Sequence, residues 1–207
     1  MSARDVILAR LRSGAPVRTD AERIAEAQAL VRNPERPAVP AGPLQGAFLA
    51  ALGGATVAAT SDTIVDLAQL PTAIGRYLAS HGLHAALTLP PDPTVRAADW
   101  SSFEIHDRPA PDEAAALTVA RCGVAETGSL VFDTGPAAPM LPNFLALHAI
   151  VLLRAADIVA HLEDIPPSSA TPRAHYWVTG VSGTTDIEGQ YVRGAHGPRF
   201  LHVILLG

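Results

Sequence analysis

The spacing of hydrophobic and polar positions changes after the first part of the chain. Apolar residues recur at helical spacing within residues 3–12 and again within residues 19–33. The second helix has a clear start, because the sequence Thr19-Asp20-Ala21-Glu22 is a capping box in which the hydroxyl and the carboxylate satisfy free backbone donors. Two short helices are therefore predicted at the N-terminal end.

A proline-rich segment follows these helices. Residues 34–43 contain four prolines, which exclude a helix interior or a central strand. Residues 1–43 are therefore predicted to form a helical N-terminal arm and a Pro-rich linker. The arm packs either on its own body or on a partner, and packing on its own body is the preferred interpretation.

Residues 44–207 alternate between short helices and apolar strands. Helices are predicted over residues 44–52, 71–80 and 156–162, and strands near residues 55–60, 84–89, 102–106, 117–120, 130–132, 149–153, 175–179 and 201–206. Fully apolar strands separated by helices indicate a sheet that is covered on both faces. The pattern predicts one α/β domain, Rossmann-like, with an open parallel or mixed sheet.

The composition excludes several kinds of chemistry. All 15 basic residues are arginine, so a Schiff-base lysine, a pyridoxal-phosphate anchor and a P-loop lysine are excluded. The single cysteine, Cys122, excludes an internal disulfide, a tetrathiolate zinc site and a four-thiolate iron–sulfur cluster. It is expected to be buried and inert. No metal site is expected, because His81 and His84 lack further ligands nearby.

Charge and hydropathy limit the partners and the cellular location that we expect for the chain. The net charge is −5 and aromatic residues make up 5% of the chain, so neither a basic stripe nor a stacking surface for nucleic acid is expected. The longest apolar run, residues 144–153, is shorter than the ~20 residues of a membrane span. The N-terminus lacks the apolar stretch of a signal peptide. A cytoplasmic protein without a membrane span is expected.

The first candidate for chemistry is the segment around Glu126, Thr127 and Gly128. A carboxylate, a hydroxyl and a glycine interrupt an apolar stretch just before a strand. One interpretation is a turn that holds Glu126 by hydrogen bonds. The other places a partly buried carboxylate at a sheet edge, where it serves acid–base catalysis.

The second candidate segment carries Ser182, Thr184, Asp186 and Glu188. It follows a strand and is therefore expected at the carboxyl end of an open sheet, where ligands bind. Its hydroxyls and backbone amides suit an anion. The alternative is a single helical turn capped by the box from Thr185 to Glu188.

The third candidate segment carries Arg193, Gly194, His196, Gly197 and Arg199, just before the last strand. It is either a tight connection or a site in which a histidine, whose charge changes near neutral pH, stands between two guanidinium groups. Across the three segments we predict Glu126, Asp186 and His196 as catalytic residues. The predicted ligand-binding residues are Thr127, Gly128, Ser182, Thr184, Glu188, Arg193, Gly194, Gly197 and Arg199.

Taken in order, several segments of the chain resemble the lactate utilization protein C family, the stand-alone form of the LUD domain. The family shows A-E-T-G-[ST]-L-V, H-I-x-V, L-E-D, S-[RK]-T-A-D-I-E and G-x-H-G-P-x-x-L-H-V-I-L. The matching segments are residues 125–131, 148–151, 162–164, 182–188 and 194–205. The resemblance covers roughly residues 44–207. It departs from the family at Gly183, where a basic residue is usual, and at Thr185, where alanine is usual.

The resemblance implies a fold similar to the NagB/RpiA/CoA transferase-like superfamily. It also implies a non-redox subunit of a complex that oxidises L-lactate to pyruvate and binds a small anion at its glycine-rich loops. No cofactor is expected in this chain, and the iron–sulfur clusters are expected on partner proteins. Two alternatives stay open. One is a stand-alone enzyme of the sugar-phosphate isomerase and CoA-transferase type with Glu126 as base or acyl acceptor, and the other is a non-catalytic ligand-binding module.

Overall fold

The computed structural model describes residues 2–14, 18–32, 36–168, 171–185 and 188–207. Contacts divide the chain into two units, Met1–Arg36 and Pro37–Gly207. The first unit contains helices α1 (Ala3–Gly14) and α2 (Asp20–Arg32). The predicted capping box is confirmed: the amide of Thr19 donates to Glu22 Oε2 at 2.7 Å, and the amide of Glu22 donates to Thr19 Oγ1 at 3.2 Å.

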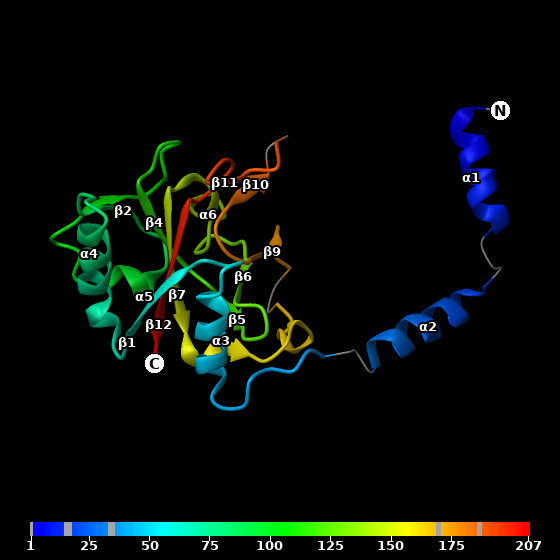
Figure 1. Cartoon of the computed structure of the whole chain (residues 1–207), viewed down its shortest axis with the longest axis horizontal. Helices are drawn as coiled ribbons and strands as arrows, with labels where there is room; N and C mark the ends of the chain where they lie inside the picture. The colour runs from blue at the N-terminus through cyan, green and yellow to red at the C-terminus, as the bar shows by residue number, and fades with distance from the viewer. Residues whose placement is uncertain (1, 15–17, 33–35, 169–170, 186–187) are drawn as a thin grey trace. The chain divides into compact units, whose positions relative to one another are not determined.

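A six-stranded parallel sheet forms the centre of the second unit (Figure 1). Its strands, in spatial order, are β1 (Thr60–Ile64), β12 (Phe200–Leu206), β7 (His148–Arg154), β4 (Ala115–Val119), β2 (Ala86–Thr88) and β3 (Glu104–His106). Every pairing in this sheet is parallel. The central strands β7 and β12 are almost entirely apolar, because both faces of the sheet are covered. The predicted open α/β sheet is confirmed.

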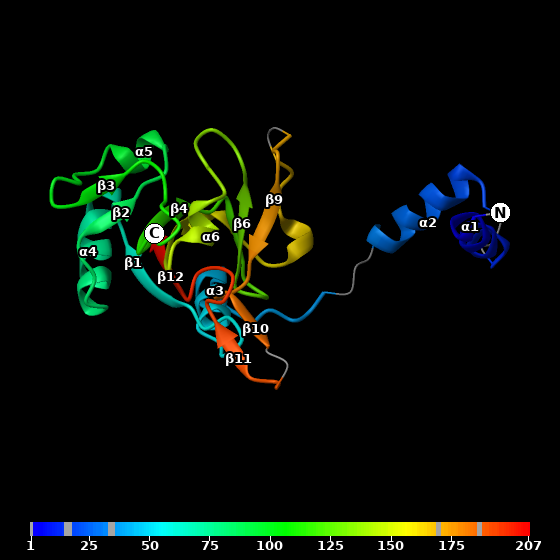
Figure 2. The ribbon, with the colours of Figure 1, turned by 90° about the horizontal axis from the view of Figure 1, so that it is seen from above.

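Helices cover one face of this sheet. Helix α4 (Leu70–Ser80) and the short helix α5 (Pro93–Arg96) lie on the same side of the central strands (Figure 2). Ile74 and Leu78 of α4 are buried against Ile150 and Ile204 of the sheet in one hydrophobic cluster. The apolar face of α4 therefore packs against the sheet.

A second, four-stranded sheet covers the other face together with helix α3 (Leu44–Leu52). Its order is β8 (Ile158–Val159), β5 (Cys122–Val124), β6 (Ser129–Asp133) and β9 (His175–Val178). Strands β5, β6 and β9 pair antiparallel, and the inward-facing apolar residues of β6 and β9 fill the layer between the two sheets. The sequence did not predict this sheet, because β5 and β8 are too short to show a period.

The remaining elements are small. They are 3-10 helices η1 (Leu67–Gln69), η2 (Ala155–Asp157) and η3 (Leu162–Asp164), helix α6 (Pro142–Leu145), and the hairpin β10 (Gly183–Thr185) and β11 (Tyr191–Arg193).

Two predicted elements are wrong. The helix expected over residues 156–162 is replaced by η2, β8 and the start of η3, because β8 pairs with β5 instead of coiling. The strand expected over residues 55–60 begins only at Thr60. The preceding residues form a turn in which the amides of Val57 and Ala58 donate to the carbonyl of Gly54.

Candidate functional site

The amino ends of the neighbouring strands β7 and β12 send alternate residues to opposite faces of the sheet. His148 and His202 face the α4 side, where both contact Tyr77. Ala149 and Leu201 face the four-stranded sheet, where both belong to its hydrophobic cluster. The same strand ends therefore build two different environments, one on each face.

On the side of the four-stranded sheet, a cavity of about 240 Å³ lies beside these strand ends. We call it the amino-edge cavity. Its apolar lining consists of Phe144, Ala149, Trp177, Val178, Pro198 and Leu201, and the rest is Asn143, Thr179, Gly180, Ser182, His196 and Gly197. Polar residues thus border a largely apolar space. This is the usual make-up of a small-molecule site.

The chain that leaves β9 is held against the turn before β1. Gly180 has a φ of +95°, and a Cβ at this position would lie 2.6 Å from the carbonyl oxygen of Val57. The amide of Val181 donates to that same oxygen at 3.3 Å, and the amide of Ser182 donates to Pro198 at 2.9 Å. Glycine is needed here because neither the backbone conformation nor the space admits a side chain. This contact fixes Ser182 in the cavity wall.

The loop before β12 closes the cavity from the other side. The amides of Arg199 and Phe200 both donate to the carbonyl of Leu147, and the amide of Gly194 donates to the carbonyl of Ser182. A Cβ on Gly197 would lie 3.2 Å from Ser182 Oγ, so the hydroxyl lies directly against this glycine. Backbone hydrogen bonds therefore bring the second and third predicted segments together.

The first predicted segment does not reach the cavity directly. The carboxylate of Glu126 accepts hydrogen bonds from the amide of Leu162 at 2.8 Å and lies 2.8 Å from His161 Nδ1. Glu126 thus anchors η3, which favours the interpretation of this segment as a hydrogen-bonded turn. Gly128 has a φ of +69° and packs against helix α3, where a Cβ would lie 2.8 Å from the amide nitrogen of Leu52.

A chain of hydroxyls nevertheless connects this segment to the cavity wall. Thr127 Oγ1 lies 2.7 Å from Ser129 Oγ, which lies 2.6 Å from Thr179 Oγ1. Thr179 lines the cavity. Thr127 is therefore linked to the cavity wall through Ser129.

Three of the predicted site residues line the amino-edge cavity together: Ser182, His196 and Gly197. Of the others described, Thr184 lies in β10, Glu188 is exposed in the turn after it, and Arg193 ends β11. The Arg199 guanidinium lies over the Phe200 ring, 5.8 Å from its centroid, and Gly194 packs against the Arg199 stem. Asp186 lies outside the described residues.

The position of the site also differs from the expectation. The second segment does follow a strand, but that strand is β9 of the four-stranded sheet, and Ser182 pairs with the loop that enters β12. The cavity therefore lies at the amino ends of the central parallel strands, not at their carboxyl ends. The missed residue Phe144 gave no signal, because it reads as an ordinary apolar residue of a short helix.

The departure from the family motif at Gly183 has a structural counterpart. A Cβ on Gly183 would fall within the ring and hydroxyl of Tyr191, the residue opposite Thr185 in the β10–β11 hairpin. Tyr191 is exposed, so its ring occupies the surface where a longer side chain at position 183 would begin. The Tyr191 ring therefore occupies the space that is left free because Gly183 has no side chain.

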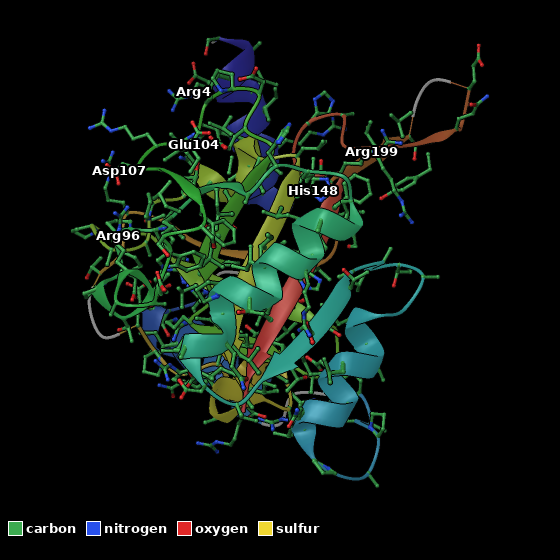
Figure 3. The ribbon with its side chains drawn as sticks, turned by 90° about the vertical axis from the view of Figure 1, so that its left-hand side faces the viewer. Arg4, Arg96, Glu104, Asp107, His148 and Arg199 are labelled. Atoms are coloured by element: carbon green, nitrogen blue, oxygen red, sulfur yellow. The ribbon has the colours of Figure 1, made fainter. Side chains whose placement is uncertain are left out.

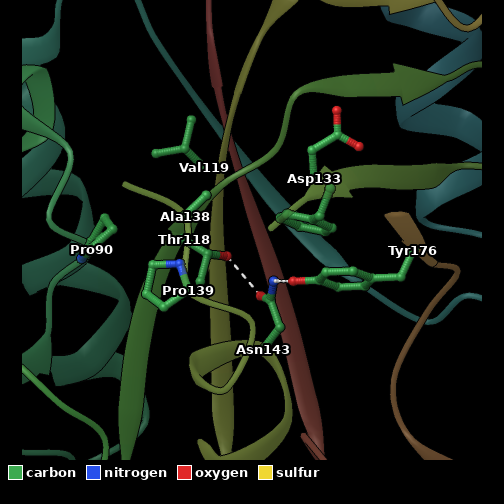
Figure 4. A pocket seen from close by; sticks show the side chains of 9 residues that line it. Pro90, Thr118, Val119, Asp133, Ala138, Pro139, Asn143 and Tyr176 are labelled. Atoms are coloured by element: carbon green, nitrogen blue, oxygen red, sulfur yellow. Dashed lines mark hydrogen bonds between the residues drawn. The ribbon is translucent and has the colours of Figure 1, made fainter. Parts of the chain in front are cut away.

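Asn143 is fixed between the two sheets (Figure 4). Its Oδ1 accepts from the Thr118 hydroxyl at 2.7 Å, and its Nδ2 donates to the Tyr176 hydroxyl at 2.9 Å. Thr118 belongs to β4 and Tyr176 to β9, so the amide links the six-stranded and four-stranded sheets. Burial raises the pKa of Tyr176, and the hydrogen bond from Asn143 opposes that shift.

On the opposite face, the Tyr77 ring of α4 contacts the rings of three histidines, His81, His148 and His202. Figure 3 labels one of them, His148, beside α4. Nδ1 of His148 lies 2.9 Å from its hydroxyl, and the His202 ring stacks on it with centroids 4.1 Å apart. Nδ1 of His202 lies 2.8 Å from Thr60 Oγ1. Burial lowers the pKa of both His148 and His202 to about 4. Both side chains are therefore neutral at pH 7.

Cys122 is buried, and burial raises the pKa of its thiol, as expected for an inert cysteine. Within the described ranges, no set of three or more His, Cys, Asp or Glu side chains is grouped as metal ligands. None of the helices seen in the described part of the chain has the length and apolar character needed to cross a bilayer.

The fold and the cavity define an α/β domain with a ligand-sized space at the amino edge of a parallel sheet. Residues 112–206 match the model of the LUD domain family. The resemblance predicted from the motifs is confirmed.

Two known proteins from Deinococcus radiodurans are similar to the chain. Lactate utilization protein C is 33% identical over 102 residues, an alignment that covers 45% of this chain and 46% of that protein. The chain therefore matches less than half the length of this relative. The crystal structure of a DUF162 family protein superimposes with a TM-score of 0.54 and 18% identity, over 81% of this chain and 100% of that one. This second likeness concerns the fold alone.

Proposed function

We propose that this chain is a non-redox component of an L-lactate utilization system that binds a small carboxylate in the amino-edge cavity. One observation carries the proposal: all the cavity residues, from Asn143 to Leu201, lie within the segment that matches the LUD domain. The name of the Deinococcus relative supports lactate as the metabolic context. In this proposal the protein works in the cytoplasm.

The polar groups of the cavity suit a carboxylate. The hydroxyls of Ser182 and Thr179 can donate hydrogen bonds to its oxygens, and the His196 imidazole can add a charge-assisted bond when protonated. The apolar lining suits the carbon chain of the acid. Electrons would leave the substrate through iron–sulfur partner proteins, because a single cysteine cannot hold a cluster with four thiolates.

Growth and purification together test this role. Deleting the gene should abolish growth on L-lactate as sole carbon source and leave growth on pyruvate unchanged, and the wild-type gene should restore it. The tagged protein, purified from lactate-grown cells, should carry partners with the absorbance and iron content of iron–sulfur clusters. Undiminished growth of the deletion strain on L-lactate would refute the proposal.

A further inference from the structure

Strand β9 forms one edge of the four-stranded sheet, where it lies beside β6 (Figure 2). The register shows which backbone groups of β9 are used in this pairing. The amide of Thr134 donates to the carbonyl of Ala174 at 2.9 Å, so every second pair from there exchanges hydrogen bonds, including the pair that contains Tyr176. The backbone N–H and C=O groups of His175 and Trp177 therefore point to the free edge.

A second hydrogen bond supports this assignment. Val131 lies opposite Trp177 in the register, and its carbonyl accepts from the amide of Arg121 at 2.8 Å, on the β5 side. In the described part of the chain, neither His175 nor Trp177 has a backbone hydrogen bond to a segment outside the sheet. Both residues are exposed. This edge is therefore open to a further strand.

The side chain of Trp177 is held in place beside the free edge. It lies on the outer face of β9, opposite to Tyr176 and Val178, which pack on the inner hydrophobic cluster. Its Nε1 donates to His175 Nε2 at 3.0 Å, and His175 Nδ1 donates to Asp133 Oδ1 at 2.6 Å. Hydrogen bonds thus fix an indole that is 50% exposed. Such a ring suits a cross-strand contact with a β-branched or aromatic residue.

Basic groups stand at both ends of this edge. Arg173, which is exposed, lies two residues before β9. At the other end, backbone hydrogen bonds of Ser182 hold the loop that carries the exposed Arg193 and Arg199. Glu188 lies in the turn at the far end of the β10–β11 hairpin. Antiparallel pairing of two copies of β9 would bring like charges together at both ends, so charge disfavours a second copy and favours a strand with acidic ends.

We propose that the free edge of β9 binds an extended segment of a partner polypeptide as an additional strand. The segment carries a β-branched or aromatic residue opposite Trp177 and acidic residues at both ends. The occupant is a peptide because the donors and acceptors of His175 and Trp177 repeat at the spacing of another strand. The inference does not depend on the proposed lactate role, since it concerns a backbone edge and not a carboxylate in the cavity.

A synthetic heptapeptide, acetyl-DVTVTVD-amide, is the probe for this edge. Calorimetric titration of the full chain should show binding, and the same peptide with arginine at both ends should bind at least tenfold more weakly at low salt. Two further peptides carry N-methyl groups either on the valines or on the threonines. One set should abolish binding and the other should change it less than threefold, because alternate amides of a strand face opposite sides.

Hydrogen exchange and two variants locate the bound peptide. The amides of His175 and Trp177 should exchange rapidly in the free chain and at least tenfold more slowly with the peptide, whereas those of Tyr176 and Val178 should exchange slowly in both states. Trp177→Pro removes the outward N–H and leaves the pairing with β6, so it should bind at least tenfold more weakly than Trp177→Ala, which keeps that N–H. Circular dichroism checks that both variants are folded.

Several outcomes would overturn the inference. Absence of binding by the acidic heptapeptide, or equal weakening by both N-methyl sets, would exclude strand addition. Unchanged exchange at His175 and Trp177 in the complex would place the peptide elsewhere. If light scattering shows a dimer that the peptide dissociates, the occupant is a second copy of the chain and the acidic partner is wrong. Each of these results leaves the test of growth on L-lactate unaffected.

Discussion

The Tyr77 hydroxyl lies 2.9 Å from Nδ1 of His148, so the last turns of α4 are tied to the first residue of β7. His202 of β12 stacks on the same tyrosine ring, and His81 lies beside it with centroids 4.4 Å apart. This cluster joins one helix to the two central strands. Because His148 and His202 are buried as neutral groups, protonation of either one should weaken this contact between α4 and the two strands.

We predict that acid weakens the fold through His148 and His202. Their pKa is about 4 in the folded chain and about 6.5 when unfolded, so the unfolded state binds more protons between these values. Their stabilisation is complete above pH 6.5 and is lost as the pH falls toward 4. Urea unfolding at pH 7, 6 and 5 should show a falling free energy of unfolding, and His202→Gln should flatten that dependence.

Other charged groups define the controls for this test. Asp62 favours the protonated form of His202, and His81 disfavours it in both buried histidines. The pKa of His106 is raised by its hydrogen bond to Glu113, so this pair stabilises below pH 6.5 and loses that contribution as the pH rises. The pH dependence of the free energy of unfolding of each variant is therefore compared with that of the wild-type chain, so that the contributions both share cancel. The exposed variant His84→Gln should leave the slope unchanged, and an equal effect of both substitutions would contradict the assignment.

Asn143 gives a second prediction. Asn143→Ala removes the amide that joins Thr118 to Tyr176 and leaves two hydroxyls without this partner between the sheets. A buried polar group without a partner costs about 1–3 kcal/mol, so we expect the free energy of unfolding to fall by about 2–3 kcal/mol. Tyr176→Phe should cost about 1 kcal/mol, and Tyr191→Phe, at an exposed position, should cost nothing measurable. Equal losses for both tyrosines would refute this role.

The central layer of the fold was predictable because its elements carry clear hydrophobic patterns. Helix α3 spans the predicted residues 44–52, and strands β7 and β12 are continuous apolar runs bounded by glycine, proline or charge. Short apolar runs bounded in this way are consistent with fully buried strands. The four-stranded sheet was not predictable in this way, because β8 contains only two residues and pairs with a strand distant in sequence.

The candidate site was predictable only in part for a related reason. Ser182 and Gly197 stand out as polar or glycine positions beside strands, and they meet because backbone hydrogen bonds join their loops. Glu126 stands out equally, but its carboxylate is used by Leu162 and His161, partners that only the fold brings near. Phe144 lines the cavity, and no local pattern distinguishes it from a core residue.

Gly180 gives a third prediction, about the support of the cavity. Gly180→Ala would place a Cβ 2.6 Å from the Val57 carbonyl oxygen and force a side chain into a positive φ, so we expect a loss of about 3 kcal/mol or more. Gly189 has a similar φ of +81° with open space around it, so Gly189→Ala should cost about 1 kcal/mol. Both glycines have a similar positive φ, so the difference in thermal unfolding between the two variants measures the cost of the close contact with Val57. Similar melting temperatures would show that the contact with Val57 has no energetic importance.

The last prediction concerns which basic or polar groups hold the carboxylate. Sequence reasoning favoured Arg193 and Arg199, but the polar side chains that line the cavity are Ser182 of the second segment and His196 of the third. A hydrogen bond to a charged group contributes about 1.5–3 kcal/mol, so Ser182→Ala and His196→Ala should each weaken L-lactate binding by roughly tenfold to a hundredfold.

Arg199→Ala is the informative comparison, because its guanidinium lies over Phe200 and not in the cavity lining. Calorimetric titration with L-lactate should show less than a twofold change for Arg199→Ala and for Arg193→Ala. A large loss in either arginine variant, with Ser182→Ala unaffected, would move the carboxylate from the amino-edge cavity to the exposed surface beside β11.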